Sequence, residues 1–287
     1  MNILTFDIEE WYMKVVKMGW RDKRAEYDRY FHRILDKLDE RSLKATFFCL
    51  GEMGRLFPET VREIDRRGHE VGCHSNVHLP LNTLTREECL DDTRVAVDSL
   101  EQCLGKKIIS YRAPAFSIGE ENRWMFSVLA ECGIERDSSV YPARRDYGGF
   151  PDFGTERPVL IKVGDSFIKE FPIPLAMVAG RRFAYSGGGY FRVLPYGFIR
   201  KQMMKSDYTM TYFHLDDLLP ESKGVMSAEE YRMHFNKSGT LIERYRRCLR
   251  ANIGKKGAMD KLMRLLDEMD FIGLSEADEQ IEHWDVI

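Results

Sequence analysis

Three carboxylates crowd the end of an apolar segment near the start of the sequence. Asp7, Glu9 and Glu10 lie in the segment TFDIEEWY, directly after the strand-like run NILTF. Neighbouring carboxylates repel each other, and apolar surroundings disfavour their charged form unless a positive charge lies close by. The segment therefore predicts a cationic partner for these carboxylates, and both a metal ion and a basic side chain would serve.

Titratable or cationic side chains also follow four later apolar runs. His74 and His78 come after EVGC, and their spacing of four residues can place both imidazoles on one face of a turn, where they could bind one metal ion. Arg112 follows IISY, Asp137 follows a short apolar run, and His214 follows YTMTYF. Taken singly, each has an ordinary structural explanation, such as a helix cap, a rim ion pair or a packed histidine. Their joint appearance after successive runs indicates a shared site.

The pattern of the chain predicts the elements that must position these side chains. Strand-like runs alternate with segments of helical period about seven or eight times, which is typical of an α/β fold with parallel strands. Thr85 and Glu88 predict a capping box at the start of a helix that Gly105 ends. In a parallel β/α barrel the reactive groups gather where strands end and loops begin. We therefore expect the five groups of side chains at one edge of the sheet.

The alternation is interrupted between about residues 141 and 195. This region is rich in glycine, proline and aromatic residues, and we expect it to be an insertion of loops and hairpins before the last strands. Residues from about 228 to 287 are expected to be mainly helical. The sequence contains no evident repeat or linker, so we predict one domain over residues 1–287.

Composition narrows the class of protein. The chain has 287 residues with a formal net charge of −3, which gives no reason to expect nucleic acid as a partner. No apolar run reaches the length of a transmembrane helix, and no signal peptide is visible at the N-terminus. The six cysteines form no CxxC pair, so we expect free thiols and a cytoplasmic location.

Four motifs, TFDIEEWY, GHEVGCHSNVH, YRAPAF and YFHL, together resemble the motif set of a known family. In this order they are similar to the motifs of the NodB-like polysaccharide deacetylases, carbohydrate esterase family four. The closer resemblance is to a subgroup with a D-x-E opening motif and a GGGYFR segment, found among bacterial cell-surface polysaccharide genes. The similarity extends from Asn2 to Leu218. It implies a distorted (β/α) barrel that hydrolyses N-acetyl or similar amide groups with a divalent metal.

The resemblance and the chemistry of amide hydrolysis together assign a metal site. Glu9, His74 and His78 are the expected ligands, because two imidazoles and one carboxylate leave positions open for water and for the carbonyl oxygen. Zinc (Zn2+) is the expected ion, with Co2+, Ni2+ and Mn2+ as alternatives. Most of the family opens with two adjacent aspartates, but Ile8 fills the second place here. Strand alternation would point Asp7 and Glu9 to the same side, with Glu10 facing away into a surface pair.

The same resemblance implies roles for the remaining side chains. Asp7 resembles the catalytic base, and Arg112 is expected to pair with it and keep it ionised. His214 is the expected general acid for the leaving nitrogen. Asp137 matches a residue that orients and charges that histidine.

A further group of residues is expected to contact the substrate. The backbone N–H of Ala115 is in the position where the family builds its oxyanion hole, and Phe116 follows it. Tyr190 or Phe191 is expected at the mouth of the site, because the glycines of GGGYFR allow a close approach of that loop.

These residues lead to one main hypothesis and two alternatives. The main hypothesis is a metal-dependent hydrolase that deacetylates an N-acetylated sugar or glycan in cell-surface polysaccharide biosynthesis. The alternatives are a cyclic amidohydrolase of the allantoinase or imidase type, and a non-catalytic saccharide-binding barrel. The expected partner is a carbohydrate, either free or lipid-linked. The basic stretch from 242 to 264 is either a solvated helix face or a contact for anionic lipid or a lipid-linked sugar phosphate.

Overall fold

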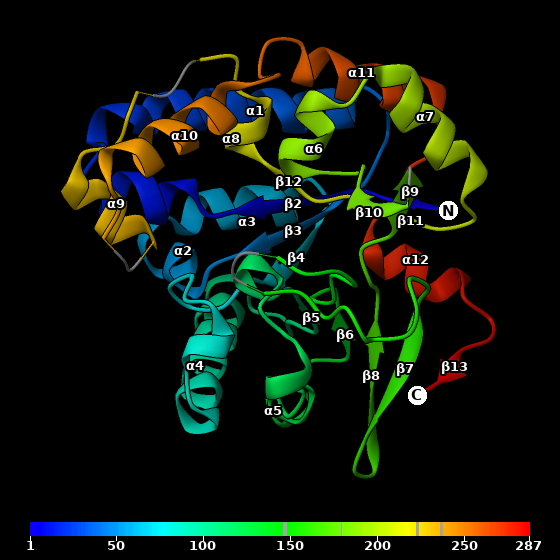
Figure 1. Ribbon diagram of the computed structural model, residues 1–287. Helices are drawn as coiled ribbons and strands as arrows, with labels where there is room; N and C mark the ends of the chain where they lie inside the picture. Colours follow the sequence, from blue (N-terminus) through cyan, green and yellow to red (C-terminus); the bar gives the residue numbers. More distant parts are fainter. Residues whose placement is uncertain (146–147, 179, 222–223, 236–237) are drawn as a thin grey trace.

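A sheet of mainly parallel strands forms the centre of the molecule, with helices packed around it (Figure 1). The computed structural model describes residues 1–145, 148–178, 180–221, 224–235 and 238–287. The strand order in the main sheet is β12-β2-β3-β4-β5-β6-β8-β7-β13. The bounds of these strands are β2 (Thr5–Ile8), β3 (Thr46–Cys49), β4 (Glu70–Cys73), β5 (Ser110–Tyr111), β6 (Arg136–Asp137), β7 (Val159–Val163), β8 (Ser166–Glu170), β12 (Phe213–His214) and β13 (Asp285–Val286).

Seven strands of the main sheet, from β12 to β8, run parallel to one another over the described ranges. This confirms the predicted α/β class with parallel strands. Two smaller sheets flank it. Strands β1 (Asn2–Ile3) and β11 (Thr209–Met210) form a parallel pair, and β9 (Leu175–Val178) and β10 (Arg181–Ala184) form an antiparallel pair.

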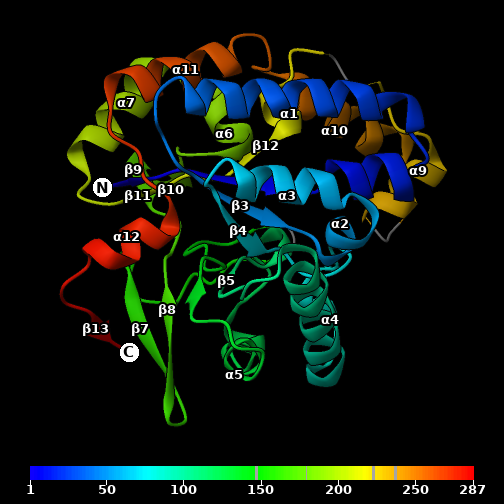
Figure 2. The ribbon, with the colours of Figure 1, turned by 180° about the vertical axis from the view of Figure 1, so that it is seen from behind.

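Helices cover the sheet on the outside, as Figure 2 shows from behind for α1 and α3. The sequence explains why α1 and α4 form where they do. α1 buries residues spaced three or four apart, such as Tyr27, Phe31 and Ile34, against the core. α4 begins with the predicted capping box and ends at Gly105, which has a φ of 70°. The helices are α1 (Arg24–Asp39), α2 (Gly51–Leu56), α3 (Pro58–Arg66), α4 (Arg86–Leu104), α5 (Met125–Glu131), α6 (Gly188–Val193), α7 (Tyr196–Lys205), α8 (Leu215–Leu218), α9 (Ala228–Phe235), α10 (Leu241–Asn252), α11 (Ala258–Glu268) and α12 (Leu274–Gln280).

The region expected as an insertion, residues 141 to 195, is joined to the main sheet. Its hairpin β7–β8 extends that sheet, because β8 pairs with β6 in parallel. The predicted strand YTMTYF is divided into β11 and β12, and these pair with β1 and β2 respectively. Residues 271–274, FIGL, also have the apolar pattern that predicts a strand, and this prediction is wrong: Ile272 forms only an isolated bridge to Ile3, and α12 begins at Leu274.

The core anchors the N-terminal motif on both sides. Phe6 of β2 stacks on Phe47 of β3 with ring centroids 4.9 Å apart. Trp11 is fully buried and meets Phe31 of α1 edge to face at 5.4 Å, while its indole N–H donates to Asp28. Aromatic burial of this kind is worth roughly 1.5–3 kcal/mol per side chain. The residues between Phe6 and Trp11 are therefore held in place from both ends.

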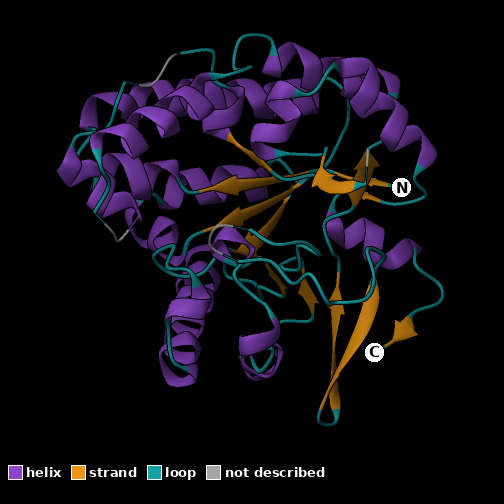
Figure 3. Cartoon of the chain, viewed as in Figure 1, coloured by secondary structure: helices purple, strands orange, loops and turns teal. Residues whose placement is uncertain are grey.

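The strands at the centre of the sheet end on the same side of the molecule, as the arrowheads in Figure 3 show. The parallel register aligns Asp7 with His214 of β12 on one side and with Phe48 of β3 on the other. Strand β4 continues this order and leads into the loop that carries His74 and His78. None of the helices in the described segments is both long and apolar enough to cross a membrane.

Candidate metal and catalytic site

The structure brings Glu9, His74 and His78 together at the strand ends. One ligand atom from each lies within 4.8 Å of the others, and the two imidazole rings are 5.2 Å apart. Oε2 of Glu9 lies beside Nε2 of His78, yet this buried oxygen makes no well-directed hydrogen bond in the described residues. A buried carboxylate oxygen and two imidazoles that converge on one point fit a divalent ion of the zinc type.

His74 is prepared for the role of a ligand. Its Nδ1 is 2.7 Å from the backbone carbonyl oxygen of Arg112, so this nitrogen carries the proton and Nε2 keeps its lone pair. Burial lowers the pKa of His74 to about 4, and the ring is therefore neutral, as metal binding requires. Burial alone would raise the pKa of Glu9, but the adjacent His78 holds it well below its ordinary value. The site thus holds an ionised carboxylate beside a neutral imidazole.

Backbone strain is concentrated around this site. The described chain has five non-glycine residues with positive φ, and four of them are Ser75, His78, Ala115 and Phe116. Two belong to the histidine loop and two belong to the loop after β5. Left-handed backbone costs of order 1–3 kcal/mol at such residues and persists where the surrounding structure enforces it, which is common at functional sites.

Arg112 is the basic side chain that the crowded carboxylates required. Its Nη1 donates to Oδ1 of Asp7 at 2.8 Å and to Thr5 Oγ1 at 2.6 Å, and both members of the Asp7–Arg112 pair are almost completely buried. Its Nε and Nη2 donate to the carbonyl and hydroxyl oxygens of Ser138, and its guanidinium lies 4.3 Å from the centre of the Phe48 ring. Burial would raise the pKa of Asp7, but the positive charges of Arg112 and His214 lower it. Asp7 is therefore ionised at neutral pH.

His214 lies between Asp7 and Asp217. Its Nε2 is 3.8 Å from Oδ2 of Asp7, and its Nδ1 is 3.1 Å from Oδ2 of Asp217. Burial would lower the pKa of His214, but the hydrogen bond to Asp217 and the charges of Glu9, Asp217 and Asp7 raise it to about 10. The imidazole is therefore protonated at neutral pH and can donate a proton.

The expectation that Asp137 orients His214 is wrong. Oδ1 of Asp137 accepts from Ser139 Oγ at 2.5 Å, and burial raises the pKa of Asp137 to about 6, although a hydrogen bond with the Glu170 side chain lowers it. Asp217 takes the expected place instead, three residues after His214 on the turn that begins there. The HxxD spacing of HLDD was the signal for this contact in the sequence, since residues three apart on a helical turn can meet.

Glu10 also departs from expectation, because it is buried and does not join a surface pair. The strand ends at Ile8 and the chain turns into a π-helix over Trp11–Lys17, so strand alternation no longer applies to Glu10. Its Oε1 accepts from the backbone N–H of Asp216 at 2.9 Å. Burial and then the charges of Asp216 and Glu9 raise the pKa of Glu10 to about 8. Glu10 therefore holds the start of the turn that follows His214.

The expected substrate-binding residues lie in different surroundings. Ala115 is partly exposed in the strained loop after Arg112, whereas Phe116 is buried and meets Tyr212 edge to face at 5.1 Å. Tyr190 is 48% exposed and stacks on Phe183 of β10 at 5.9 Å. Phe191 is buried in the core against Phe213. Substrate contact by Ala115 and Tyr190 stays a prediction, while the burial of Phe116 and Phe191 gives both a packing role.

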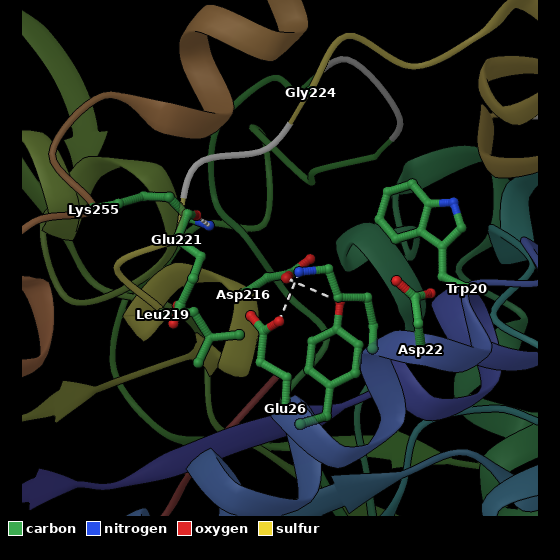
Figure 4. Close-up of a pocket in the computed structure, with 10 residues that line it drawn as sticks. Trp20, Asp22, Glu26, Asp216, Leu219, Glu221, Gly224 and Lys255 are labelled. Atoms are coloured by element: carbon green, nitrogen blue, oxygen red, sulfur yellow. Dashed lines mark hydrogen bonds and ion pairs between the residues drawn. The ribbon is translucent and has the colours of Figure 1, made fainter.

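A cavity of about 280 Å3 lies beside the turn that carries His214 (Figure 4). Asp216 forms part of its wall and receives the Tyr27 hydroxyl at 3.4 Å. Trp20 and Tyr27 add aromatic surface, and Glu221 lies near Lys255, whose Nζ donates to the Glu221 carbonyl oxygen at 2.8 Å. Aromatic surface combined with charged side chains suits a polar ligand with apolar ring faces, such as a sugar.

Family models match two successive parts of the chain. Residues 3–136 match the polysaccharide deacetylase family, and residues 138–278 match a domain of unknown function, DUF3473. The first part contains Asp7, the three proposed metal ligands and Arg112. The second part contains His214 and Asp217. The candidate site is therefore assembled from both matches.

Two curated relatives match short segments of the chain. A peptidoglycan-N-acetylglucosamine deacetylase of Bacillus cereus is 43% identical over 56 residues, which are 20% of this chain and 20% of that protein. The peptidoglycan-N-acetylmuramic acid deacetylase PdaC of Bacillus subtilis is 35% identical over 92 residues, which are 32% of this chain and 20% of that protein. The chain thus spans about a fifth of the length of each of these two curated relatives.

Two solved structures share the fold over nearly the whole chain. A Mycobacterium smegmatis protein assigned as a polysaccharide deacetylase has a TM-score of 0.62 at 18% identity, covering 98% of this chain and 89% of that one. A CE4 family pseudoenzyme from Bacillus anthracis has a TM-score of 0.50 at 13% identity, covering 96% of this chain and 64% of that one. Because one neighbour is a pseudoenzyme, the fold alone does not decide activity and the site residues must.

Proposed function

We propose, from the match of residues 3–136 to the polysaccharide deacetylase family, that the chain is a metal-dependent hydrolase that removes the acetyl group from an N-acetylated sugar. One observation carries the proposal. The Glu9–His74–His78 cluster lies next to an ionised carboxylate, Asp7, and a protonated imidazole, His214. Amide hydrolysis needs a base and an acid in opposite protonation states within one site.

The proposed metal would be held by Glu9 Oε2, His74 Nε2 and one nitrogen of His78. When bound, a divalent ion supplies charge to polarise the acetyl carbonyl and to lower the pKa of water. The donor set of one carboxylate and two imidazoles is typical of catalytic zinc sites, and the hydrogen bond from His74 Nδ1 to the Arg112 carbonyl fixes the ring for this purpose.

The side chains of the protein perform the proton transfers in the proposed mechanism. Asp7 takes a proton from the attacking water, and Arg112 keeps Asp7 ionised by direct contact at 2.8 Å. The backbone N–H of Ala115 is the proposed donor to the oxyanion; one such donor is typically worth about 3 kcal/mol. His214 gives its proton to the departing sugar nitrogen, so the amine leaves in neutral form. Asp217 accepts a hydrogen bond from Nδ1 of His214, so Nε2 is the nitrogen that donates the proton to the departing amine.

The proposed substrate is an N-acetylated intermediate in the biosynthesis of a bacterial cell-surface glycan. Both curated relatives described above are named for peptidoglycan sugars, which supports an N-acetylated hexosamine as the reacting unit. The cavity lined by Trp20, Tyr27 and Asp216 offers a place for a neighbouring sugar unit. All six cysteines are free thiols, which supports the proposal that the protein works in the reducing environment of the cytoplasm.

A substrate panel tests the proposed function. Purified protein loaded with zinc should release acetate from chitin oligosaccharides and from peptidoglycan fragments, and should leave allantoin and cyclic imides intact. The Asp7→Asn protein should lose most of this activity, while a matched surface change, His32→Ala on α1, should retain it. Ring opening of a cyclic amide without acetate release would instead establish the cyclic amidohydrolase alternative.

We also propose an anionic lipid surface as the contact of α10. This helix has no buried residue, and its apolar side chains on one face are more than half exposed, while Arg246 and Arg250 are exposed beside them. The apolar stripe consists of Leu241, Ile242, Tyr245, Leu249 and Ile253. Basic residues next to an exposed apolar stripe are typical of helices that lie on anionic membranes.

The basic stretch is not uniformly solvated, however. Lys255 is buried and donates to Glu221, and Lys261 donates to three backbone carbonyls, so neither is available to a membrane. Sedimentation with phosphatidylglycerol vesicles tests the proposal, with phosphatidylcholine vesicles as the control. Leu249→Glu should abolish sedimentation with the anionic vesicles. If the parent protein sediments with neither kind of vesicle, and Leu249→Glu converts a dimer into a monomer, then α10 contacts a second copy of the chain instead.

A further inference from the structure

Asp217 is a bridge between the imidazole of His214 and a buried arginine. Its Oδ2 faces Nδ1 of His214 at 3.1 Å, and its Oδ1 faces Nε of Arg192 at 2.9 Å. The side chain of Arg192 is only 8% exposed, and it belongs to α6, more than twenty residues before His214 in the sequence. Each carboxylate oxygen therefore faces a different partner, His214 through a hydrogen bond and Arg192 through an ion pair, and the two contacts together favour one orientation of the carboxylate.

Arg192 is itself held on its far side. Its Nη1 donates to the carbonyl oxygens of Ala251 at 2.5 Å and Ile253 at 3.2 Å, and its Nη2 donates to that of Arg250 at 3.2 Å. These carbonyls lie at the C-terminal end of α10, where unpaired carbonyl oxygens favour a cation. Gly254 has a φ of +75° and lies directly against the Arg192 carbonyl, so a side chain there would collide with it. The guanidinium thus reaches Asp217 from a fixed position.

Other residues of the GGGYFR segment contact Tyr212 and Phe213, the two residues before His214. Gly187 forms a bridge with Tyr212, and a Cβ at Gly187 would collide with the Tyr212 carbonyl oxygen. Phe191 meets Phe213 at a centroid distance of 4.8 Å with the rings close to perpendicular. Lys261 of α11 donates to the carbonyls of Phe191, Arg192 and Leu194 and so holds the end of α6. Glycine, phenylalanine and arginine of one segment therefore contact residues 212, 213 and 217 around the histidine.

We infer that the GGGYFR segment is a positioning device for the general acid: Arg192 orients Asp217, and Asp217 orients His214 so that Nε2 faces Asp7 and the reacting amide. The inference rests on the proposed function, because it takes His214 to be the acid. It also gives a role to the part of the chain that matches a domain of unknown function, residues 138–278. That part supplies His214, Asp217, Arg192 and the helix ends that hold the arginine.

The reason for such a device lies in the geometry of the imidazole. A histidine ring can rotate about its side-chain bonds, and an acid that points away from the leaving nitrogen is useless whatever its charge. A carboxylate on Nδ1 fixes both the ring orientation and the nitrogen that carries the reactive proton. Three acidic side chains that raise the pKa of His214 lie close to it, namely Asp7, Glu9 and Asp217. Without Arg192, Oδ1 of Asp217 would lose the cation that faces it, and the carboxylate would be held less firmly against Nδ1 of His214.

The first test separates proton delivery from general damage. Arg192→Met and Asp217→Asn should each lower kcat on a chitin oligosaccharide by roughly 10- to 100-fold, but change hydrolysis of 4-nitrophenyl acetate by less than about threefold. The ester has a leaving group that needs no proton, so it does not require an oriented acid. Arg192→Lys keeps the charge and should recover part of the loss. Arg200→Met, which removes a surface arginine paired with Glu268, is the matched control and should leave both rates unchanged. Equal losses on amide and ester would overturn the inference.

The second test does not depend on activity. Proton NMR at low temperature should show a downfield Nδ1–H signal from a hydrogen-bonded imidazole, identified by its loss in His214→Gln. The signal should shift or disappear in Arg192→Met and in Asp217→Asn, and stay in Arg200→Met. An unchanged signal in Arg192→Met would overturn the inference even in an active enzyme. A signal that responds as expected in a protein that hydrolyses no N-acetyl sugar would leave the Arg192–Asp217–His214 arrangement standing and refute the proposed function instead.

Discussion

Replacement of Arg112 by methionine should destabilise the protein strongly, because it leaves Asp7 buried without its cation. Arg112 is completely buried and donates four hydrogen bonds, to Asp7, to Thr5 and twice to Ser138. Removing one partner of a buried ion pair typically costs about 3–5 kcal/mol, because the remaining charge is uncompensated. We expect a loss of this size in the free energy of unfolding of Arg112→Met at pH 7, measured by urea denaturation of the metal-free protein with tryptophan fluorescence.

The sign of the pH dependence gives this prediction a second part. The folded pKa of Asp7 lies below its ordinary value, so its contribution to stability is present above the unfolded pKa of about 3.9 and is lost as the pH falls through the folded value. In Arg112→Met, burial should instead raise the pKa of Asp7, and protonation then relieves the uncompensated charge. The difference in stability between the two proteins should therefore shrink as the pH is lowered from 7 to 5.

A double variant shows whether the charge is the cause. Asp7→Asn combined with Arg112→Met removes both charges, so its loss of stability should be clearly smaller than the sum of the two single losses. The exposed pair Arg200–Glu268 serves as a control, because surface pairs are worth about 0–1 kcal/mol. If the double variant were as unstable as the sum of the single variants, or if Arg112→Met cost less than about 1 kcal/mol, the reasoning about this pair would be refuted.

Three further predictions follow from the site. Metal analysis should find about one divalent ion per chain, and His74→Ala should lose it while His32→Ala keeps it; equal metal content in both would exclude the assigned ligands. The rate on an amide substrate should fall on the alkaline side as His214 loses its proton, near its raised pKa of about 10, and Asp217→Asn should move this limb to lower pH; a limb that does not move would contradict the acid role. Glu10→Gln should gain stability relative to the parent protein as the pH rises from about 4.5 to about 8, because the raised pKa of Glu10 means that the unfolded chain loses this proton first; denaturant titrations that show no such gain would count against the burial of a neutral Glu10.

Much of the arrangement could be predicted from local patterns in the sequence. Asp7, His74, Arg112 and His214 follow apolar runs, and in a parallel sheet such positions meet at one edge. The start of α4 could also be predicted, because the capping box of Thr85 and Glu88 involves residues only three apart. These predictions depend on strand order and short-range spacing, which the sequence carries directly.

The remaining features depend on three-dimensional neighbours that spacing does not reveal. Glu10 is buried because a π-helix follows the strand at once, and strand alternation gives no warning of that turn. Asp137 is the last residue of β6, and its neighbour across the sheet is Glu170, which pairs with it at the same register. The link from Arg192 to Asp217 joins residues of two separate helices and is invisible without the fold. Motif resemblance could assign the types of groups at the site but not every partner among them.

The most direct test of the account is acetate release from a chitin oligosaccharide by the zinc-loaded protein and by its Asp7→Asn variant, with metal content measured in both. Asp7 is the proposed base. It pairs with Arg112 and lies 3.8 Å from the proposed acid, His214, so its replacement tests the proposed proton transfers directly. The account predicts equal metal content, acetate and free amine in equal amounts from the parent protein, and a loss of at least ~100-fold in the variant. Near-parental acetate release by Asp7→Asn, or no acetate release by the fully loaded parent protein on any N-acetylated glycan, would contradict it.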